Sequence, residues 1–257
     1  AIGLFCVFLK IGRQMRFWRA ATRWQSSWMT RELYASLVFF PSVLASLVAP
    51  GPVPFAFAAV SGAVFLFCQA KILHRARGIP AWRVSLMPWM LIATALLEGA
   101  GALAIVAFAL GASMRTAAWP SFAAASIVVL AVLNAALWRS YVGSARANGI
   151  PPLSRRVLEA FTPKLTAFGH AAPLVLAILA WIVAPASVPL LALAGVAAIA
   201  GGAAWKYTVI VRAAYMQGFD LRKMPQRGSG QVAAPRRMDR SAMPLPENAA
   251  PLKSTVE

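Results

Sequence analysis

Acidic residues, histidines and cysteines are scarce in this chain. It has 7 Asp and Glu residues, 2 His and 2 Cys among 257 residues. Cys6 and Cys68 lie in separate apolar runs and form no Cys-x-x-Cys pair, so we expect neither a zinc site nor an iron–sulfur cluster. His74 and His170 lie near the ends of predicted spans, on the basic side. We expect both to be solvated at a membrane interface, and the alternative is one haem held by the two imidazoles.

Charged residues are also rare, at 12% of the chain, which is about half the share usual in a soluble domain. Hydrophobic residues make up 60% and fall in long runs. Runs of about 18 or more apolar residues predict transmembrane helices, and these runs do not alternate as the strands of a membrane β-barrel would. The sequence therefore predicts an all-α fold, a polytopic transmembrane helix bundle.

The apolar runs predict six complete spans and one truncated N-terminal span. Residues 1–9, AIGLFCVFL, are apolar from the first position, and we expect them to be the end of a helix that begins upstream. Proline, glycine, serine and charge dominate after Gln217, so we divide the chain into a transmembrane helical anchor domain, 1–215, and a disordered cytoplasmic tail, 216–257. The complete spans are predicted at 33–49, 52–73, 86–112, 117–141, 168–184 and 187–213.

Basic residues are distributed very unequally between the two sides of the predicted spans. Of the 25 Lys and Arg residues, only Arg115 lies on the opposite side from the rest. Under the positive-inside rule, the basic side faces the cytoplasm. We therefore predict a multi-pass protein of the bacterial inner (cytoplasmic) membrane with its basic loops and C-terminus in the cytoplasm. The net charge of +18 then reflects topology, and we do not expect a nucleic-acid partner.

The polar residues Glu98, Lys206 and Asn134 lie inside predicted spans and need a partner or a role. A carboxylate near the middle of a span costs roughly 3 kcal/mol on insertion scales, so Glu98 needs a hydrogen-bonding partner or a role as a proton relay. Lys206 either extends to the basic face or pairs with Glu32 or Glu98. We expect Asn134 to form an interhelical hydrogen bond. Small residues stand four apart at Ala95 and Gly99 and at Ala197 and Gly201, which is consistent with close helix contacts there, the alternative being that alanine and glycine are common throughout the chain.

Glu32 stands where the first basic loop enters a span, within the segment SWMTRE. Thr30 is a suitable N-cap residue, and Glu32 in the first turn would interact favourably with the helix dipole. The functional alternative is a proton acceptor at the membrane edge, with Lys10, Arg19 and Arg31 around it. A quinone site needs an apolar slot, a few hydrogen-bonding groups and a protonatable carboxylate, and this position offers them.

Short motifs lie at the ends of several predicted spans. They are KIGR at 10–13, RFWRA at 16–20, SWMTRE at 27–32, AKIL at 70–73, PAW at 80–82, KYT at 206–208, RAAYMQGF at 212–219 and PQRG at 225–228. Together they resemble the anchor-subunit family of dimethyl sulfoxide reductase, whose members commonly have His-Leu-Gly and a basic residue, an Arg-Ala pair, and Ser-Trp-Leu-Ser-Arg-Glu at the first three positions. The resemblance covers about residues 1–230 and is most specific in the first and last motifs.

The resemblance implies a particular architecture and set of partners. Family members have eight spans, so one further span would precede the truncated one. Their anchor subunit forms a heterotrimer with a molybdopterin catalytic subunit and a four-cluster iron–sulfur subunit. It binds a quinone or quinol, ubiquinone or menaquinone, beside the nearest cluster and has no metal or haem of its own. The functional Glu of the family maps onto Glu32. Its His maps onto Lys10, a departure that still allows a hydrogen bond to a quinone oxygen.

We therefore interpret the chain as the membrane anchor and quinone-reactive subunit of a molybdenum-cofactor iron–sulfur oxidoreductase. It would pass electrons between the quinone pool and its iron–sulfur partner. The quinone would bind between the helix that ends near Lys10 and the helix that starts at Glu32. Glu32 would transfer the proton. The pocket would be shaped by Arg19, Trp28 and Arg31.

The basic face is the predicted docking surface, because its cations complement an acidic partner. Two other interpretations remain open. A small-solute or ion transporter would use Glu98 and Lys206 in its substrate path, although the sequence has no convincing internal repeat. A bare scaffold would have no quinone site. The docking residues are predicted to be Arg13, Arg16, Arg23, Arg75 and Arg77.

Overall fold

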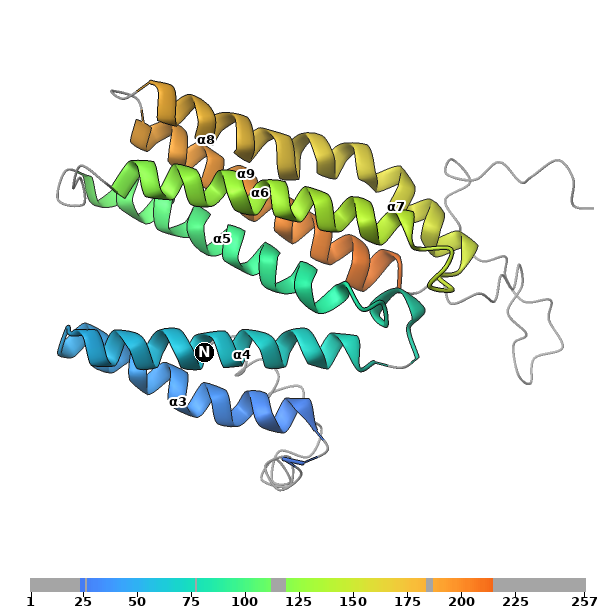
Figure 1. Ribbon diagram of the computed structural model, residues 1–257, viewed down its shortest axis with the longest axis horizontal. Helices are drawn as coiled ribbons and strands as arrows, with labels where there is room; N and C mark the ends of the chain where they lie inside the picture. The colour runs from blue at the N-terminus through green and yellow to red at the C-terminus, as the bar shows by residue number, and fades with distance from the viewer. Residues whose placement is uncertain (1–23, 26, 77, 112–118, 184–186, 215–257) are drawn as a thin grey trace, which may run out of the picture. The chain divides into compact units, whose positions relative to one another are not determined.

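The computed structural model describes residues 24–25, 27–76, 78–111, 119–183 and 187–214. Within these residues every regular element is helical and there is no strand, which confirms the all-α prediction. The predicted truncated span at 1–9 and the predicted tail at 216–257 lie outside the described residues. The elements (Figure 1) are α3 (Trp28–Val48), α4 (Pro52–His74), the short 3-10 helix η2 (Pro80–Trp82), α5 (Met87–Leu110), α6 (Trp119–Gly143), α7 (Pro152–Lys164), the π-helical segment η4 (Leu165–Ala171), α8 (Ala172–Ile182), α9 (Ser187–Tyr207) and the π-helical segment η6 (Thr208–Arg212).

Six helical segments in the described part of the chain are long and apolar enough to span a membrane. They confirm the six predicted spans, with corrections to two of the starts. The first begins at Trp28 instead of residue 33, and the fifth begins at Pro152 instead of residue 168. The prediction followed the apolar run alone, whereas α7, η4 and α8 form one continuous helical segment. A helix extends into a flanking polar segment when its backbone hydrogen bonds continue there.

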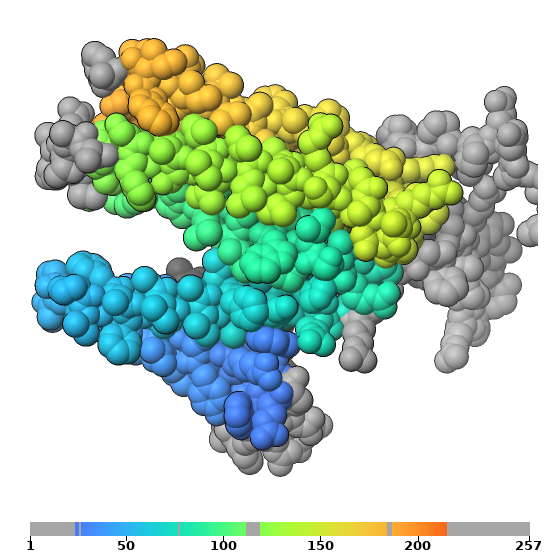
Figure 2. Space-filling model, viewed as in Figure 1, coloured from blue at the N-terminus to red at the C-terminus, as the bar shows by residue number. Residues whose placement is uncertain are grey.

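The described helices form two groups, which we call the hairpin and the bundle. The hairpin consists of α3 and α4, which pack along each other. The bundle consists of α5 to α9, in which α5 packs against α6 and α9, and α8 packs against the same two helices. Hairpin and bundle meet where α4 contacts α5 (Figure 1). In the space-filling view a hollow separates α4 from α6 (Figure 2).

Two clusters of buried side chains form the core of the bundle. The first, near η2, is built of large side chains such as Trp138 and Tyr141. Within it, the Tyr141 hydroxyl donates a hydrogen bond to the carbonyl oxygen of Ala81 at 2.9 Å. The second, between α5, α6, α8 and α9, consists mainly of alanines, including Ala104 and Ala194. Small side chains allow membrane helices to approach closely, and dispersion contacts then hold them together.

Two pairs of glycines mark close contacts between bundle helices. A Cβ atom on Gly101 would lie 2.8 Å from the Cα of Gly195, and one on Gly169 would lie 3.3 Å from the Cα of Gly201. The predicted close contact is therefore confirmed at Gly201. At Gly99 the prediction is wrong, because a Cβ there would meet nothing within 4 Å. The spacing of small residues identifies a helix face with small side chains, but it does not show whether another helix packs against that face.

Candidate functional site

The described residues contain two clusters of predicted site residues. Trp28, Arg31 and Glu32 lie at the start of α3 in the hairpin. Glu98 lies on α5 and Lys206 on α9, both in the bundle. The predicted residues outside the described part of the chain are Lys10, Arg13, Arg16, Arg19, Arg23 and Arg77.

The N-terminus of α3 positions the first cluster. Ser27 is the N-cap residue, and its side-chain oxygen accepts a hydrogen bond from the backbone N–H of Thr30 at 3.4 Å. The prediction that Thr30 caps this helix is therefore wrong, and Glu32 lies beyond the first turn. Serine and threonine are both good N-cap residues, so the pattern alone did not separate them. The earlier start places Arg31 and Glu32 three and four residues after Trp28 on the same helix, so each side chain is a neighbour of the indole.

Three contacts hold the Arg31 side chain. Its Nε donates a hydrogen bond to the carbonyl oxygen of Trp24 at 2.9 Å, and its Nη2 donates to the carbonyl oxygen of Gln25 at 2.7 Å. Its guanidinium carbon lies 4.4 Å from the centre of the Trp28 ring, a cation–π contact. Arg31 therefore fixes both the preceding backbone and the indole of Trp28.

A groove of about 640 Å³ runs between α3 and α4. Its walls are mainly aromatic and aliphatic, and Arg31 is the charged side chain on them. Trp28 and Phe67 meet edge to face at this groove, with ring centres 5.8 Å apart. Sites for small apolar ligands have volumes of about 300 to 1,000 Å³ and a few well-placed polar groups. The groove therefore has the volume and the mainly apolar lining of a site for a small apolar ligand, with the guanidinium of Arg31 as a cationic donor on its wall.

The Glu32 carboxylate contacts α4 beside the groove and does not line it. Its Oε1 accepts a hydrogen bond from Nε2 of Gln69 at 3.1 Å. The prediction did not include Gln69. The sequence did contain a signal for Gln69, because it is an amide side chain inside the apolar run at 52–73, near the end of the run that is followed by basic residues. Gln69 follows the groove-lining residue Cys68, so the Glu32–Gln69 pair lies next to the groove.

The C-terminal end of α4 adds positive charge to this part of the hairpin. The Nζ of Lys71 lies 5.2 Å from the centre of the Phe67 ring, a second cation–π contact. The predicted docking residue Arg75 is the C-cap of α4. Cations at a helix C-terminus are stabilised by the helix dipole. The basic side chains of Arg31, Lys71 and Arg75 thus lie at the same end of the hairpin.

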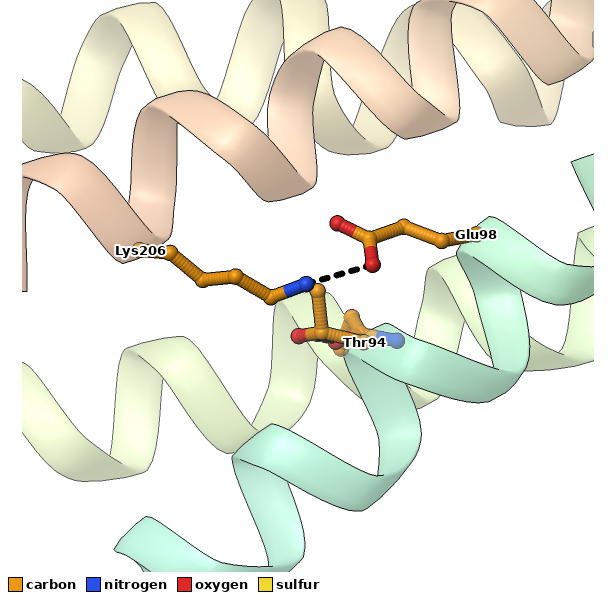
Figure 3. Close-up of polar contacts among 4 residues, drawn as sticks. Thr94, Glu98 and Lys206 are labelled. Atoms are coloured by element: carbon orange, nitrogen blue, oxygen red, sulfur yellow. Dashed lines mark hydrogen bonds and ion pairs between the residues drawn. The ribbon is translucent and has the colours of Figure 1, made fainter. Parts of the chain in front are cut away.

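The second cluster is an ion pair between two bundle helices. Nζ of Lys206 lies 2.5 Å from Oε2 of Glu98 (Figure 3). Of the arrangements open to Lys206, the structure therefore shows the pair with Glu98. The two side chains are 33% and 20% exposed respectively, so protein atoms shield the pair in part. A Cβ atom at Gly202 would overlap the Glu98 carboxylate, so glycine leaves room for it.

Thr94 lies near this ion pair (Figure 3). The Thr94 hydroxyl, four residues before Glu98 on α5, donates to Oδ1 of Asn134 on α6 at 2.8 Å. Nδ2 of Asn134 donates to the carbonyl oxygen of Leu130 at 2.8 Å. The predicted interhelical hydrogen bond of Asn134 is confirmed.

A cavity of about 230 Å³ lies between α4, α5 and the last turns of the bundle. Gln69 and Lys206 both lie on its wall, together with apolar side chains such as Leu73 and Leu91. Gln69 thus contacts Glu32 and also borders the space that Lys206 borders. One hydrogen-bonding partner from each polar cluster therefore lines this cavity.

His170 is buried in the bundle, and the expectation of a solvated imidazole is wrong. It is 8% exposed, and its Nδ1 has no hydrogen-bond partner within the described residues. The reason is the earlier start of its span at Pro152, which places residue 170 well inside the helical segment. A cavity of about 10 Å³ is lined by His170, Thr94 and Asn134 and suits about one water molecule. Among the described residues no three His, Cys, Asp or Glu side chains gather as metal ligands.

The family comparison covers the hairpin and most of the bundle. The family model described as DMSO reductase anchor subunit (DmsC) matches residues 1–203. The chain belongs to this family. Searches of the curated proteins and of the solved structures find no match.

Family membership and the six spanning helices together show a multi-span membrane protein, an anchor subunit of a DMSO reductase-type complex. Membership implies partnership with the catalytic and iron–sulfur subunits of such a complex. The matched residues include Trp28, Glu32, Gln69 and Glu98, whereas Lys206 lies just beyond them.

Proposed function

We propose that this chain is the membrane anchor and quinone-reactive subunit of a molybdenum-cofactor iron–sulfur oxidoreductase. It passes electrons between the quinone pool and an iron–sulfur partner subunit. The observation that supports this most is the groove beside Trp28 and Arg31, with the Glu32–Gln69 pair next to it. An apolar slot, hydrogen-bond donors and a protonatable carboxylate are the groups that a quinone site requires. Membership of an anchor-subunit family is consistent with a partner that exchanges the electrons.

Aromatic surface and one cation hold the ring in this proposal. Trp28 and Phe67 enclose it with apolar surface and exclude water from it. Arg31 donates a hydrogen bond to a ring oxygen. Because the Arg31 side chain is already anchored to two backbone carbonyls, little conformational entropy is lost when it binds the ligand.

The Glu32 carboxylate accepts and returns the proton in this proposal. When bound, quinol supplies two electrons and two protons, and Glu32 accepts a proton at its carboxylate. The hydrogen bond from Gln69 holds that carboxylate in one orientation beside the groove. In the direction of quinone reduction, Glu32 returns the proton to the ring oxygen. General acid–base catalysis of this kind typically contributes about 10²- to 10⁴-fold to a rate.

Residues before α3 complete the proposed site. Lys10 donates a hydrogen bond to the other quinone oxygen, at the position where the family has a His, and Arg19 adds a second cation. The position of Lys10 follows from the resemblance of the sequence motifs, whereas Arg19 is assigned from its place in the basic segment before Glu32. They add positive charge, which favours an anionic ring oxygen.

The partner subunits dock on the basic side of the membrane, which we place in the cytoplasm of a bacterial inner membrane. Arginine side chains on that side complement an acidic partner surface and orient it during association. The proposed docking residues are Arg13, Arg16, Arg23, Arg75 and Arg77.

The alternative function, a transporter, would require Glu98 and Lys206 to bind a transported solute or ion. The two side chains instead lie 2.5 Å apart and neutralise each other. Their mutual contact therefore accounts for both charges without a transported ion, and we retain the anchor-subunit function.

Replacing Glu32 by Gln in the assembled complex tests the proposal. The amide keeps the shape of the side chain but does not accept a proton, so we expect quinone-linked electron transfer to fall by about 100-fold. Electron transfer from an artificial donor directly to the catalytic partner should be unchanged. The matched control is Glu159→Gln, the same chemical change at an exposed position on α7. The proposal is wrong if an assembled E32Q complex reacts with quinol as fast as the wild type.

A further inference from the structure

A line of polar groups leads from the hairpin into the bundle. Glu32 accepts a hydrogen bond from Gln69 at 3.1 Å, and Gln69 shares the wall of the 230 Å³ cavity with Lys206. Lys206 in turn lies 2.5 Å from Glu98 (Figure 3). Side chains of α3, α4, α9 and α5 are therefore connected by two direct contacts and one cavity.

Stability alone gives little reason for the Glu98–Lys206 pair. Ionisable residues within a membrane span are costly, and a well-packed apolar pair of similar volume is often equally or more stabilising. What the pair provides is chemical. It places a carboxylate, a group that can exchange a proton, inside the bundle and beside an ammonium that lines the cavity. Thr94, which lies near the pair in Figure 3, donates a hydrogen bond from its hydroxyl to Asn134.

The cavity between Gln69 and Lys206 has room for water. Its volume of about 230 Å³ exceeds that of several water molecules, since each occupies about 30 Å³ in the liquid. The amide of Gln69 and the ammonium of Lys206 supply the polar partners that cavity water needs. Among the described residues, Lys206 is the one titratable side chain on its wall, and Glu98 is bound directly to it.

The chemistry of the proposed quinone site creates a need for a second proton acceptor. Oxidation of one quinol releases two protons, whereas Glu32 is a single carboxylate. The described side chains that line the groove include no carboxylate. A second acceptor within reach of Glu32 would allow the same side chain to accept both protons in turn.

We propose that Glu98 is this second acceptor. It lies at the inner end of a water-filled proton path, which we call the branch and which starts at Glu32 and crosses the cavity. The inference rests on the proposed quinone site. Quinol gives its two electrons to the iron–sulfur partner and its first proton to Glu32. That proton crosses the cavity water to Glu98, which becomes neutral while Lys206 remains an ammonium. Glu32 then accepts the second proton, and both protons leave to bulk water before the next turnover. Quinone reduction uses the same steps in reverse.

Gln69 is a positioning residue in this branch. An amide does not relay a proton readily, so the proton moves through the water and not through Gln69. The role of Gln69 is to orient the Glu32 carboxylate and to bind the first water of the cavity. Ala95 also lies on the cavity wall, and its small side chain leaves the space open.

The double variant Glu98→Gln with Lys206→Met tests the branch in the assembled complex. It removes both charges together, so no unpaired ion is left in the bundle. We expect kcat for quinol oxidation to fall by about tenfold with KM unchanged, because an interaction used only during turnover has been removed. The pH profile of kcat should also lose one ionisation.

A second variant blocks the water and leaves the ion pair intact. Ala95→Leu fills the cavity, and we expect the same fall in kcat with KM unchanged. Its matched control is Ala102→Leu, the same change at an exposed position of α5, which should keep the wild-type kcat. If the double variant does not assemble, Ala95→Leu still tests whether protons cross the cavity to Glu98.

The outcomes separate the branch from the quinone site. If E32Q impairs quinol oxidation while A95L and the double variant keep the wild-type kcat and pH profile, the ion pair is structural and only the branch is wrong. If the double variant does not assemble and only A95L can be measured, a wild-type kcat overturns the branch and a lowered kcat supports it. If E32Q itself has no effect, the quinone site is wrong and the branch falls with it.

Discussion

The hairpin and the bundle bury different shares of their side chains. In the most apolar part of α3 and of α4, 17% of the residues are buried, compared with 33% in three spans of the bundle and 44% in the span Ser187–Arg212. Both clusters of buried hydrophobic side chains lie outside α3 and α4, on whose surface large side chains such as Phe57 and Tyr34 are exposed. The bundle is thus a packed scaffold, and the hairpin offers an open apolar groove.

This difference has a physical basis in the lipid surroundings. Lipid tails are as apolar as leucine, so an exposed aromatic side chain on a membrane helix has no strong drive to be buried. A groove that would collapse in water is therefore tolerated between α3 and α4. The packed bundle, by contrast, can hold a polar pair such as Glu98 and Lys206 in a fixed geometry, because its helices do not separate easily.

Matched glycine substitutions test the difference in packing and should show the largest effect on stability. A Cβ atom on Gly195 would overlap the backbone oxygen of Gly101, whereas one on Gly62 would lie 2.9 Å from a ring carbon of Phe39. A backbone atom yields only if α5 shifts, but a phenyl ring can rotate. We expect Gly195→Ala to cost about 3 kcal/mol and Gly62→Ala about 1 kcal/mol or less. Thermal unfolding of the purified complex measures both, and equal losses would mean that the hairpin is packed as tightly as the bundle.

Removing one partner of the ion pair should destabilise the bundle more than removing both. Glu98→Gln leaves the Lys206 ammonium without its counter-charge, and we expect a loss of about 2 kcal/mol, reduced from the fully buried case because the pair is partly exposed. The double variant with Lys206→Met should recover most of this loss. Unfolding of the two variants and of Lys206→Met completes a double-mutant cycle. A double variant less stable than Glu98→Gln would show that the pair itself stabilises the bundle.

Part of this architecture follows from local sequence and part does not. The apolar run at 52–73 predicted α4, observed at Pro52–His74, because hydropathy alone decides whether a segment enters the membrane. The start of α3 at Ser27 was missed because two suitable caps compete within one turn. The burial of His170 and the position of Gln69 were also missed. The burial of His170 depends on the start of its span at Pro152 and the contact of Gln69 on where α3 lies, and composition encodes neither.

Truncating the aromatic wall should affect the hairpin site but not the bundle. Trp28→Ala removes a groove wall and the surface on which Arg31 rests, so we expect KM for quinol to rise about tenfold, equivalent to about 1.4 kcal/mol, with kcat nearly unchanged. The matched control is Trp181→Ala on α8, where the indole is 57% exposed. Steady-state kinetics of the assembled complex compare the two. If KM rises equally in Trp28→Ala and Trp181→Ala, the loss of any tryptophan perturbs the membrane domain and Trp28 has no specific role in binding quinol.

The smallest expected effect concerns the cap of α3. Ser27→Ala removes the acceptor of the Thr30 N–H and should cost about 1 kcal/mol, confined to the first turn of the hairpin. Faster hydrogen exchange of the Thr30 amide would report it. The control is Ser126→Ala on α6, whose hydroxyl donates to the Phe122 carbonyl within the helix and caps nothing. If the Thr30 amide exchanges at the wild-type rate in the Ser27→Ala variant, the cap does not hold the start of α3.

The account depends most on the claim that the quinone binds in the hairpin. Photolabelling of the assembled complex with an azido-substituted quinone, followed by peptide mapping, tests this directly. We predict labels on α3 and α4, at groove-lining positions such as Trp28, Tyr34 and Phe67, and we predict that excess unlabelled quinol prevents them. Labels confined to α5–α9, or labels on α3 and α4 that excess quinol does not reduce, would contradict the account.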